Sequence, residues 1–183
     1  MGVVVLAVLT IWFNDKEIAG EGQLLSQLSV LLLGLVSSAA LFRGTSSYGW
    51  ERRLWLLISG AFIYLALDEY LLIHERFDKR IHKILGIQET TLTDALDGVI
   101  VLLYGAAAIA VVVIFRHILR QYPGSLTYLG IAFSFLFLMI FLDLVEHALF
   151  DNPYLEESCK VVSEYFFLLA VVMPERRDSP LLN

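Results

Sequence analysis

Histidines and acidic residues are the side chains that could do chemistry in this otherwise apolar sequence. Asp143 and His147 are four residues apart, so on a helix they share one face. Asp68 and Glu75 are seven apart and also share a face, with His74 on its flank. Imidazole and carboxylate ligands from two facing helices suit Zn²⁺, Fe or Mn²⁺. The spacing therefore predicts a divalent-metal site whose ligands are His74, His147, Asp143 and either Asp68 or Glu75.

Two further acids, Glu164 and Asp97, occupy neighbouring apolar segments and are candidates for catalytic roles. A carboxylate beside a metal can orient a ligand or act as a general base. In these roles they would make the protein a metal-dependent enzyme acting on an apolar substrate. A structural alternative exists, because Glu157, Lys160 and Glu164 share one helix face and a Glu–Lys ion pair would compete with a ligand role.

The composition indicates a membrane protein. Of the 183 residues, 58% are hydrophobic and only 17% are charged, and the mean hydropathy is +0.72. The net charge of −6 and the absence of a polybasic run exclude nucleic acid as a partner, since binding it requires clustered Lys and Arg. The expected partner is the lipid bilayer.

Apolar segments of near-spanning length predict an all-α, polytopic transmembrane bundle of five to six spans, forming a single domain over residues 1–183. A span needs about 20 apolar residues, and only helices satisfy the backbone of such a segment in lipid. The predicted spans are 23–43, 52–77, 94–116, 125–150 and 155–173. The segment 2–13 is equally apolar but short, and it is counted as the sixth.

A weak internal repeat relates two of these segments. The string H-x-x-F-D occurs at 74–78 and again at 147–151, each time at the end of an apolar helix and before a helix that opens with acids. The repeat predicts two helical hairpins of the same polarity, an arrangement that commonly places binding sites at the repeat interface. The predicted ligands would then meet at one end of the bundle.

The charges of the loops predict an orientation. Arginines gather in the connections at one side: Arg43, Arg52, Arg53, Arg116, Arg120, Arg176 and Arg177. By the positive-inside rule that side is cytoplasmic. The acidic loops, which contain residues such as Asp151 and Glu156, then lie on the non-cytoplasmic side.

Two strings carry a family resemblance, LDEYLLIHE at 67–75 and EESCK at 156–160. With them, the chain from about residue 50 to 173 resembles small bacterial multi-pass membrane proteins to which no activity is attached. The resemblance implies a helical bundle in the bacterial inner membrane.

Two alternatives to a metal site stay open. The chain could be a small accessory or assembly subunit of a larger respiratory or photosynthetic membrane complex, or a homo-oligomer, with structural or pigment-binding histidines. It could also form a proton or cation pathway, in which Asp68, Asp143 and Glu164 titrate in turn.

Overall fold

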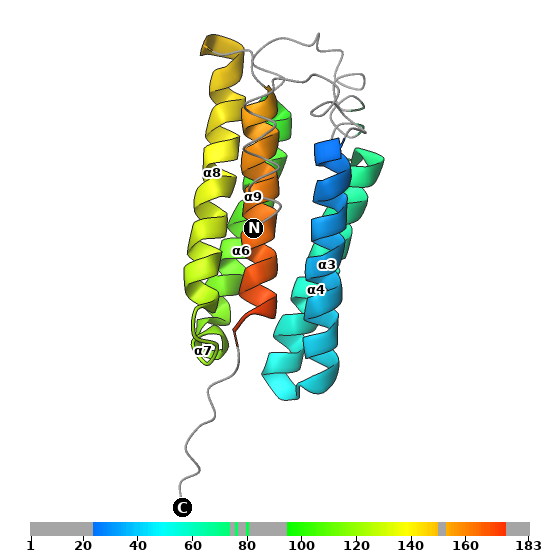
Figure 1. The fold of residues 1–183 in the computed structure, drawn as a ribbon, viewed down its shortest axis with the longest axis vertical. Coiled ribbons are helices and arrows are strands. Elements are labelled where there is room, and N and C mark those ends of the chain that lie inside the picture. Colours follow the sequence, from blue (N-terminus) through cyan, green and yellow to red (C-terminus); the bar gives the residue numbers. More distant parts are fainter. Residues whose placement is uncertain (1–23, 74–75, 77–79, 81–94, 150–152, 175–183) are drawn as a thin grey trace, which may run out of the picture.

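The chain folds into a bundle of α-helices in the computed structural model (Figure 1). The structure describes residues 24–73, 76, 80, 95–149 and 153–174, with the side chains of all of these except residues 95–101, 143–149 and 153. The helices are α3 (Leu24–Ser46), α4 (Gly49–Leu71), α6 (Ala95–Ile114), α7 (Arg116–Leu119), α8 (Ser125–Leu149) and α9 (Pro153–Val172). No β-strand occurs in these described ranges, and the predicted all-α bundle is confirmed.

The helix bounds follow the predicted segments closely, with one difference at α4. This helix begins at Gly49 and ends at Leu71, whereas the apolar pattern predicted a helix running to residue 77. Leu72 takes the left-handed conformation, with φ 51° and ψ 48°, and its N–H donates to the carbonyl oxygen of Asp68. The regular helix ends because Leu72 leaves right-handed geometry. The predicted short segment 2–13 lies outside the described residues.

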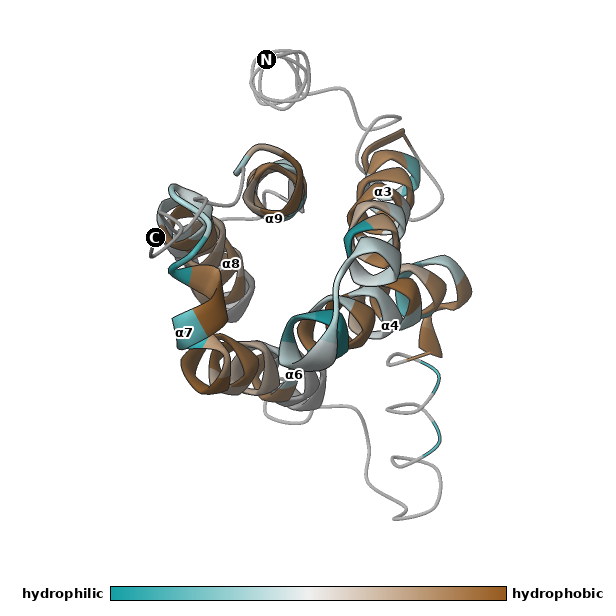
Figure 2. Cartoon of the chain, turned by 90° about the horizontal axis from the view of Figure 1, so that it is seen from below, coloured by the Kyte–Doolittle hydropathy of each residue, from teal (hydrophilic) through white to brown (hydrophobic). Residues whose placement is uncertain are grey.

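Two antiparallel helix pairs form the bundle. Helices α3 and α4 pack along their length, as do α8 and α9, and α3 packs against α9 to join the two pairs (Figures 1 and 2). Helix α6 packs against α8 and reaches α4 through the hydroxyls of Tyr64 and Tyr104, which lie 2.9 Å apart. The far ends of α4 and α8 and the starts of α6 and α9 all lie at one end of the bundle (Figure 1).

Three helical segments among the described residues are long and apolar enough to cross a membrane. They are α3, α4 and residues Ser125–Leu142 of α8. Helix α6 contributes a shorter apolar stretch, Leu102–Ile114, and α9 is apolar mainly in its second half. Large apolar side chains such as Leu31, Phe42 and Phe141 are exposed on the outside of the bundle, as lipid contact requires. The architecture is compatible with an integral membrane protein, while the total of five to six spans stays a prediction.

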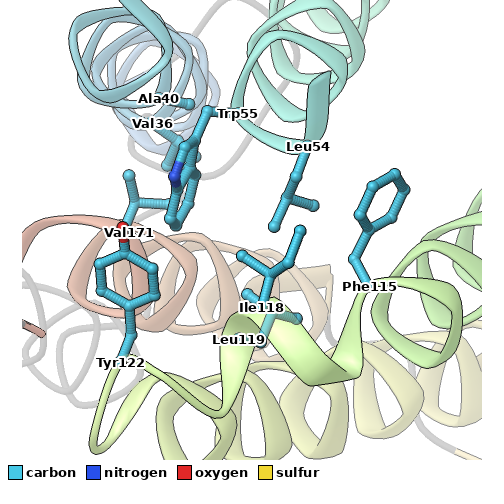
Figure 3. Close-up of a cluster of buried hydrophobic side chains, with 9 residues drawn as sticks. All are labelled: Val36, Ala40, Leu54, Trp55, Phe115, Ile118, Leu119, Tyr122 and Val171. Atoms are coloured by element: carbon cyan, nitrogen blue, oxygen red, sulfur yellow. The ribbon is translucent and has the colours of Figure 1, made fainter. Parts of the chain in front are cut away.

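The largest buried cluster lies at the end of the bundle where α3 ends and α4 begins (Figure 3). Trp55, almost fully buried, is its largest member and meets the ring of Tyr122 edge-on at 5.4 Å. The other members are Val36, Ala40, Leu54, Phe115, Ile118, Leu119 and Val171. This cluster brings α3, α4, α7 and α9 together, so it sets how the two helix pairs meet.

Small residues allow the helices of each pair to approach closely. A Cβ at Gly44 would lie 3.1 Å from Leu56 Cδ2, so a side chain there would require Leu56 to shift, and glycine lets α3 and α4 meet closely. Buried serines link the helices by hydrogen bonds. Ser37 Oγ donates to the carbonyl oxygen of Ser59 at 2.9 Å, and Ser163 Oγ donates to that of Ala132 at 2.9 Å. These contacts hold the pairs in register.

Candidate functional site

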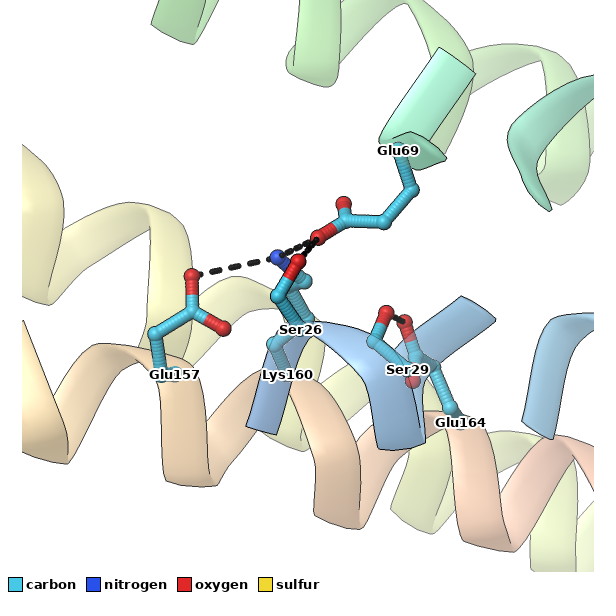
Figure 4. A network of polar contacts seen from close by, with 6 residues as sticks. All are labelled: Ser26, Ser29, Glu69, Glu157, Lys160 and Glu164. Carbon is cyan, nitrogen blue, oxygen red and sulfur yellow. Dashed lines mark hydrogen bonds and ion pairs between the residues drawn. The ribbon is translucent and has the colours of Figure 1, made fainter. Parts of the chain in front are cut away.

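Six polar side chains from α3, α4 and α9 meet inside the bundle, near the end where α9 begins (Figure 4). We call this set the carboxylate cluster. Its members are Ser26 and Ser29 of α3, Glu69 of α4, and Glu157, Lys160 and Glu164 of α9. Three helices far apart in sequence therefore contribute to one site.

Lys160 lies at the centre of the carboxylate cluster. Its Nζ is 2.7 Å from Glu69 Oε1 on α4 and 3.1 Å from Glu157 Oε1, one turn earlier on α9. Ser26 Oγ also donates to Glu69 Oε1, at 3.2 Å. The side chains of the ion-pairing residues are only 15–21% exposed, so solvent screening of these ion pairs is weak.

Helical spacing explains the α9 part of the site. Glu157, Lys160 and Glu164 are separated by three and four residues, which places them on one face of the helix. Helix α9 is amphipathic in its first half for this reason. Glu164 lies eleven residues after the first residue of α9, about 16 Å along the axis. Its carboxyl group is therefore deep in the bundle.

Glu164 is the most buried acid of the cluster, with 6% of the residue exposed. Ser29 Oγ donates to its Oε1 at 2.6 Å, a short bond of the kind that charge assistance or a protonated carboxyl favours. Its Oε2 is buried and has no hydrogen-bond partner within the described part of the chain, and the same holds for Glu157 Oε2. Two carboxyl oxygens inside the cluster are thus left with unused capacity to bind a proton or cation.

The charge of the cluster does not balance. Three carboxyl groups surround one ammonium group, so full ionisation would leave an excess of two negative charges in a poorly solvated place. Ionised groups in such surroundings cost several kcal/mol each unless they are paired. Proton or cation binding removes this cost, and this is the chemistry that the arrangement favours.

The predicted site residues divide into described and undescribed ones. Glu164 and Asp68 are both buried in the bundle, Asp68 with only 4% of the residue exposed. Asp97 lies on α6, and Asp143 and His147 lie on α8, but their side chains are outside the described set. His74 and Glu75 follow α4 in sequence and lie outside the described residues altogether. Whether the predicted metal ligands meet therefore stays a prediction.

The metal-site prediction, which started from the histidines, did not include Glu69. It considered Lys160 only as an ion-pair partner that would compete with a ligand role of the acids on α9. Asp68 and Glu69 are adjacent, so on a helix they point about 100° apart, and the metal hypothesis used Asp68. The structure brings Glu69 to the cation instead. A signal was present, because a lysine in the first half of an apolar helix needs a buried anion, and α4 carries one at matching depth. The predicted Glu–Lys ion pair within α9 is confirmed between Glu157 and Lys160.

An apolar layer separates the carboxylate cluster from the other end of the bundle. On α3 it consists of Leu32, Leu33 and Val36, which fill the interval between Ser29 and the next buried serine. On α4 and α9 it continues with Phe62, whose ring is 5.4 Å from that of Phe167, and with Leu168, which packs against both buried clusters. The side chains named here are all apolar.

Beyond the apolar layer lies a second polar group centred on Arg43. Its guanidinium carbon is 5.2 Å from the ring centre of Trp55 and 5.0 Å from that of Tyr122. Its Nη2 donates to the carbonyl oxygen of Pro174 at 2.6 Å, just past the end of α9. Tyr122 donates a short hydrogen bond to Glu51 of α4. These contacts connect the ends of α3, α4 and α9, which is a structural role.

No group of three or more His, Cys, Asp or Glu side chains within the described part of the chain is arranged to hold a metal ion. Against known families, one model matches, that of the family described as Domain of unknown function (DUF8692), over residues 3–173. No curated protein and no solved structure matches the chain.

Proposed function

The chain belongs to the Domain of unknown function (DUF8692) family, and from the geometry of its carboxylate cluster we propose that it is an integral membrane protein that binds protons inside the bundle. The observation that carries the proposal is the buried Oε2 of Glu164, which has no hydrogen-bond partner among the described residues and whose carboxyl group lies near other acids. A carboxyl group placed in this way is stabilised when it takes up a proton, because the neutral form avoids the cost of a buried charge.

A proton suits the site better than a metal ion does. A divalent ion takes four to eight ligands, whereas a proton needs one oxygen and a neighbouring acceptor. The space where a cation would contact Glu69 and Glu157 is already taken by the Lys160 ammonium. Protonation of Glu164 reduces the net charge of the cluster without displacing Lys160.

The position of the cluster suggests the direction of exchange. The apolar layer of Leu33, Phe62 and Phe167 lies on one side, so protons would enter from the end where α9 begins. By the positive-inside rule that end is non-cytoplasmic, because five of the seven described arginines lie at the other end and only Arg76 and Arg80 follow α4. In a bacterial inner membrane the site would then take up protons from the non-cytoplasmic side. Release of these protons to the cytoplasmic side would require the bundle to open.

Infrared difference spectroscopy on purified protein tests the proposal. At neutral pH the protein should show the C=O stretching band of a protonated carboxyl group, and Glu164→Gln should remove it. Glu156→Gln is the matched control, because it removes an acid from the same helix outside the carboxylate cluster. A spectrum that Glu164→Gln leaves unchanged would falsify the assignment of the proton to Glu164.

A second candidate function is the divalent-metal site predicted from the histidines, with Zn²⁺, Fe or Mn²⁺ as the ion. The observation in its favour is that α4 and α8 end at the same end of the bundle (Figure 1). His147 lies two residues before the last residue of α8, and His74 follows the last residue of α4 by three. A metal-dependent reaction on an apolar substrate, with Asp97 or Glu164 as the base, would rest on this site.

Elemental measurement on protein purified without chelator tests the second candidate. Stoichiometric metal that falls in a His74→Ala/His147→Ala variant supports it. Metal content that is low, or that the double substitution leaves unchanged, counts against it. His117→Ala is the matched control, because His117 lies in α7 at the opposite end of the bundle.

A further inference from the structure

A set of exposed arginines lies at the end of the bundle opposite the carboxylate cluster, and the proton proposal makes no use of it. We call it the arginine surface and define it as Arg52, Arg53, Arg116 and Arg120, all exposed. The first two belong to the first two turns of α4, and the others to α7 and the residue after it. The structure records no salt bridge for any of the four within the described residues.

The two halves of the arginine surface are held together by packing. The ring of Trp50 on α4 is 6.3 Å from that of Phe115, the residue just before α7. Below them, Leu54 packs with Ile118 and Leu119 in the buried cluster (Figure 3). The arginines of α4 and α7 are therefore neighbours because the fold fixes their helices against each other.

Glu51, an acid of the first turn of α4, has partners outside the arginine surface. Glu51 accepts hydrogen bonds from Tyr122 and from Ser47 Oγ, the latter at 2.9 Å, so its carboxylate is directed to other partners. Arg43, the remaining described cation at this end, is engaged with Pro174. The surface thus presents net positive charge. Figure 2 views the chain from this end and shows hydrophilic residues at α7.

The location identifies the kind of ligand. The surface lies at the ends of membrane-spanning helices, where phospholipid headgroups are found. Trp50 and Tyr48 beside it are 62% and 86% exposed, as is typical of aromatic side chains at the membrane interface. Every described Lys or Arg at this end is an arginine, whose planar group binds phosphate oxygens in pairs.

Arg53 is already oriented for such a contact. Its guanidinium carbon lies 4.7 Å from the centre of the Trp50 ring, so one face of the group is covered by the ring. The N–H groups along its edge remain available to a phosphate. We propose that the arginine surface binds the headgroup phosphate of an anionic phospholipid, between the start of α4 and α7.

Native mass spectrometry of the full chain in detergent, with phosphatidylglycerol or phosphatidylcholine added, tests this proposal. We expect the anionic lipid to be retained preferentially, and Arg53→Gln/Arg116→Gln to weaken its binding by roughly fivefold for each arginine removed. Arg76→Gln is the control, because it removes an exposed arginine just beyond α4, at the opposite end.

Three results would overturn the proposal. They are equal retention of the two lipids by the unmodified chain, unchanged retention by the double variant, and an equal loss in the Arg76→Gln control, which would indicate attraction to net charge alone. An unchanged melting temperature of the double variant in phosphatidylcholine nanodiscs shows that the bundle is intact. The proposal does not depend on the carboxylate cluster, so failure of either leaves the other standing.

Discussion

Ser29 Oγ lies 2.6 Å from Glu164 Oε1, and this hydrogen bond joins two helices whose residues are 135 positions apart in the chain. Both residues are buried, Ser29 completely. Among the described residues, the Ser29 hydroxyl is the hydrogen-bond partner of the Glu164 carboxyl group, since Oε2 has no partner there. It therefore fixes the orientation of the acid on which the proposed function rests.

Replacing Ser29 with alanine should destabilise the bundle. The substitution leaves both oxygens of Glu164 without a hydrogen-bond partner, and an unsatisfied buried polar group costs about 1–3 kcal/mol. Denaturant unfolding in detergent measures the loss. Ser38→Ala is the control on the same helix, because Ser38 is exposed and bonds only to the carbonyl oxygen of Gly34. Equal losses for both variants would contradict the importance of the bond.

Replacing Lys160 alone should destabilise the protein more than replacing Lys160 and its partner Glu69 together. Lys160→Met leaves Glu69 and Glu157 without a counter-ion, and breaking a buried pair in this way costs about 3–5 kcal/mol. The double variant Lys160→Met/Glu69→Gln should recover part of the loss. A double-mutant cycle on the free energy of unfolding gives the coupling. Strict additivity of the two substitutions would show that the ion pair contributes nothing.

The end of α4 offers a test of backbone strain. Leu72 has a φ of 51°, a conformation that costs a side-chain-bearing residue about 1–2 kcal/mol and glycine almost nothing. Leu72→Gly should therefore be tolerated better than Leu71→Gly, which weakens the last turn of a regular helix by about 1 kcal/mol. Thermal unfolding of the two variants measures the difference. The opposite order would mean that Leu72 does not adopt this conformation.

Alkaline pH should loosen the end of the bundle around Tyr122. Burial raises the pKa of Tyr122, and its hydrogen bond to Glu51 raises the pKa further. A folded-state pKa above the unfolded value stabilises the fold fully below the ordinary tyrosine pKa of about 10, and this contribution is lost as pH rises through the folded-state value.

Tyr122→Phe isolates this effect from the other tyrosines. The variant should lose less stability than the unmodified chain between neutral pH and pH values above about 10. Melting temperatures recorded across that range supply the comparison. Tyr48→Phe is the control, because Tyr48 is 86% exposed. Parallel curves for the unmodified chain and Tyr122→Phe would show that the phenol at 122 is not coupled to folding.

Helix positions could be predicted from the sequence because apolar length and charged flanks are local properties. The bounds of α3, α8 and α9 lie within three residues of the predicted segments. The early end of α4 was missed, since nothing in the apolar run through Leu72 distinguishes a left-handed residue from a helical one. The ion pair of Glu157 with Lys160 was foreseen, because both residues lie on one helix.

The contacts between helices could not be predicted from the spacing of residues within each helix. Helical spacing shows which residues share a face, but it does not show which helix that face meets. Asp68 was the candidate and Glu69 was not, but the packing of α3 between α4 and α9 brought Glu69 to Lys160. The partner of Glu164 was likewise unexpected, because buried serines are common in membrane helices and their spacing carries no signal of an acid.

By itself the sequence determined that this chain is an apolar helical bundle with ionisable residues inside it, because hydropathy and helical period depend only on neighbouring residues. The tertiary structure alone decided which of those residues meet. Helix rotation and the order of packing around the bundle set that choice, and both arise from contacts such as that of Ser29 with Glu164, which link distant parts of the chain.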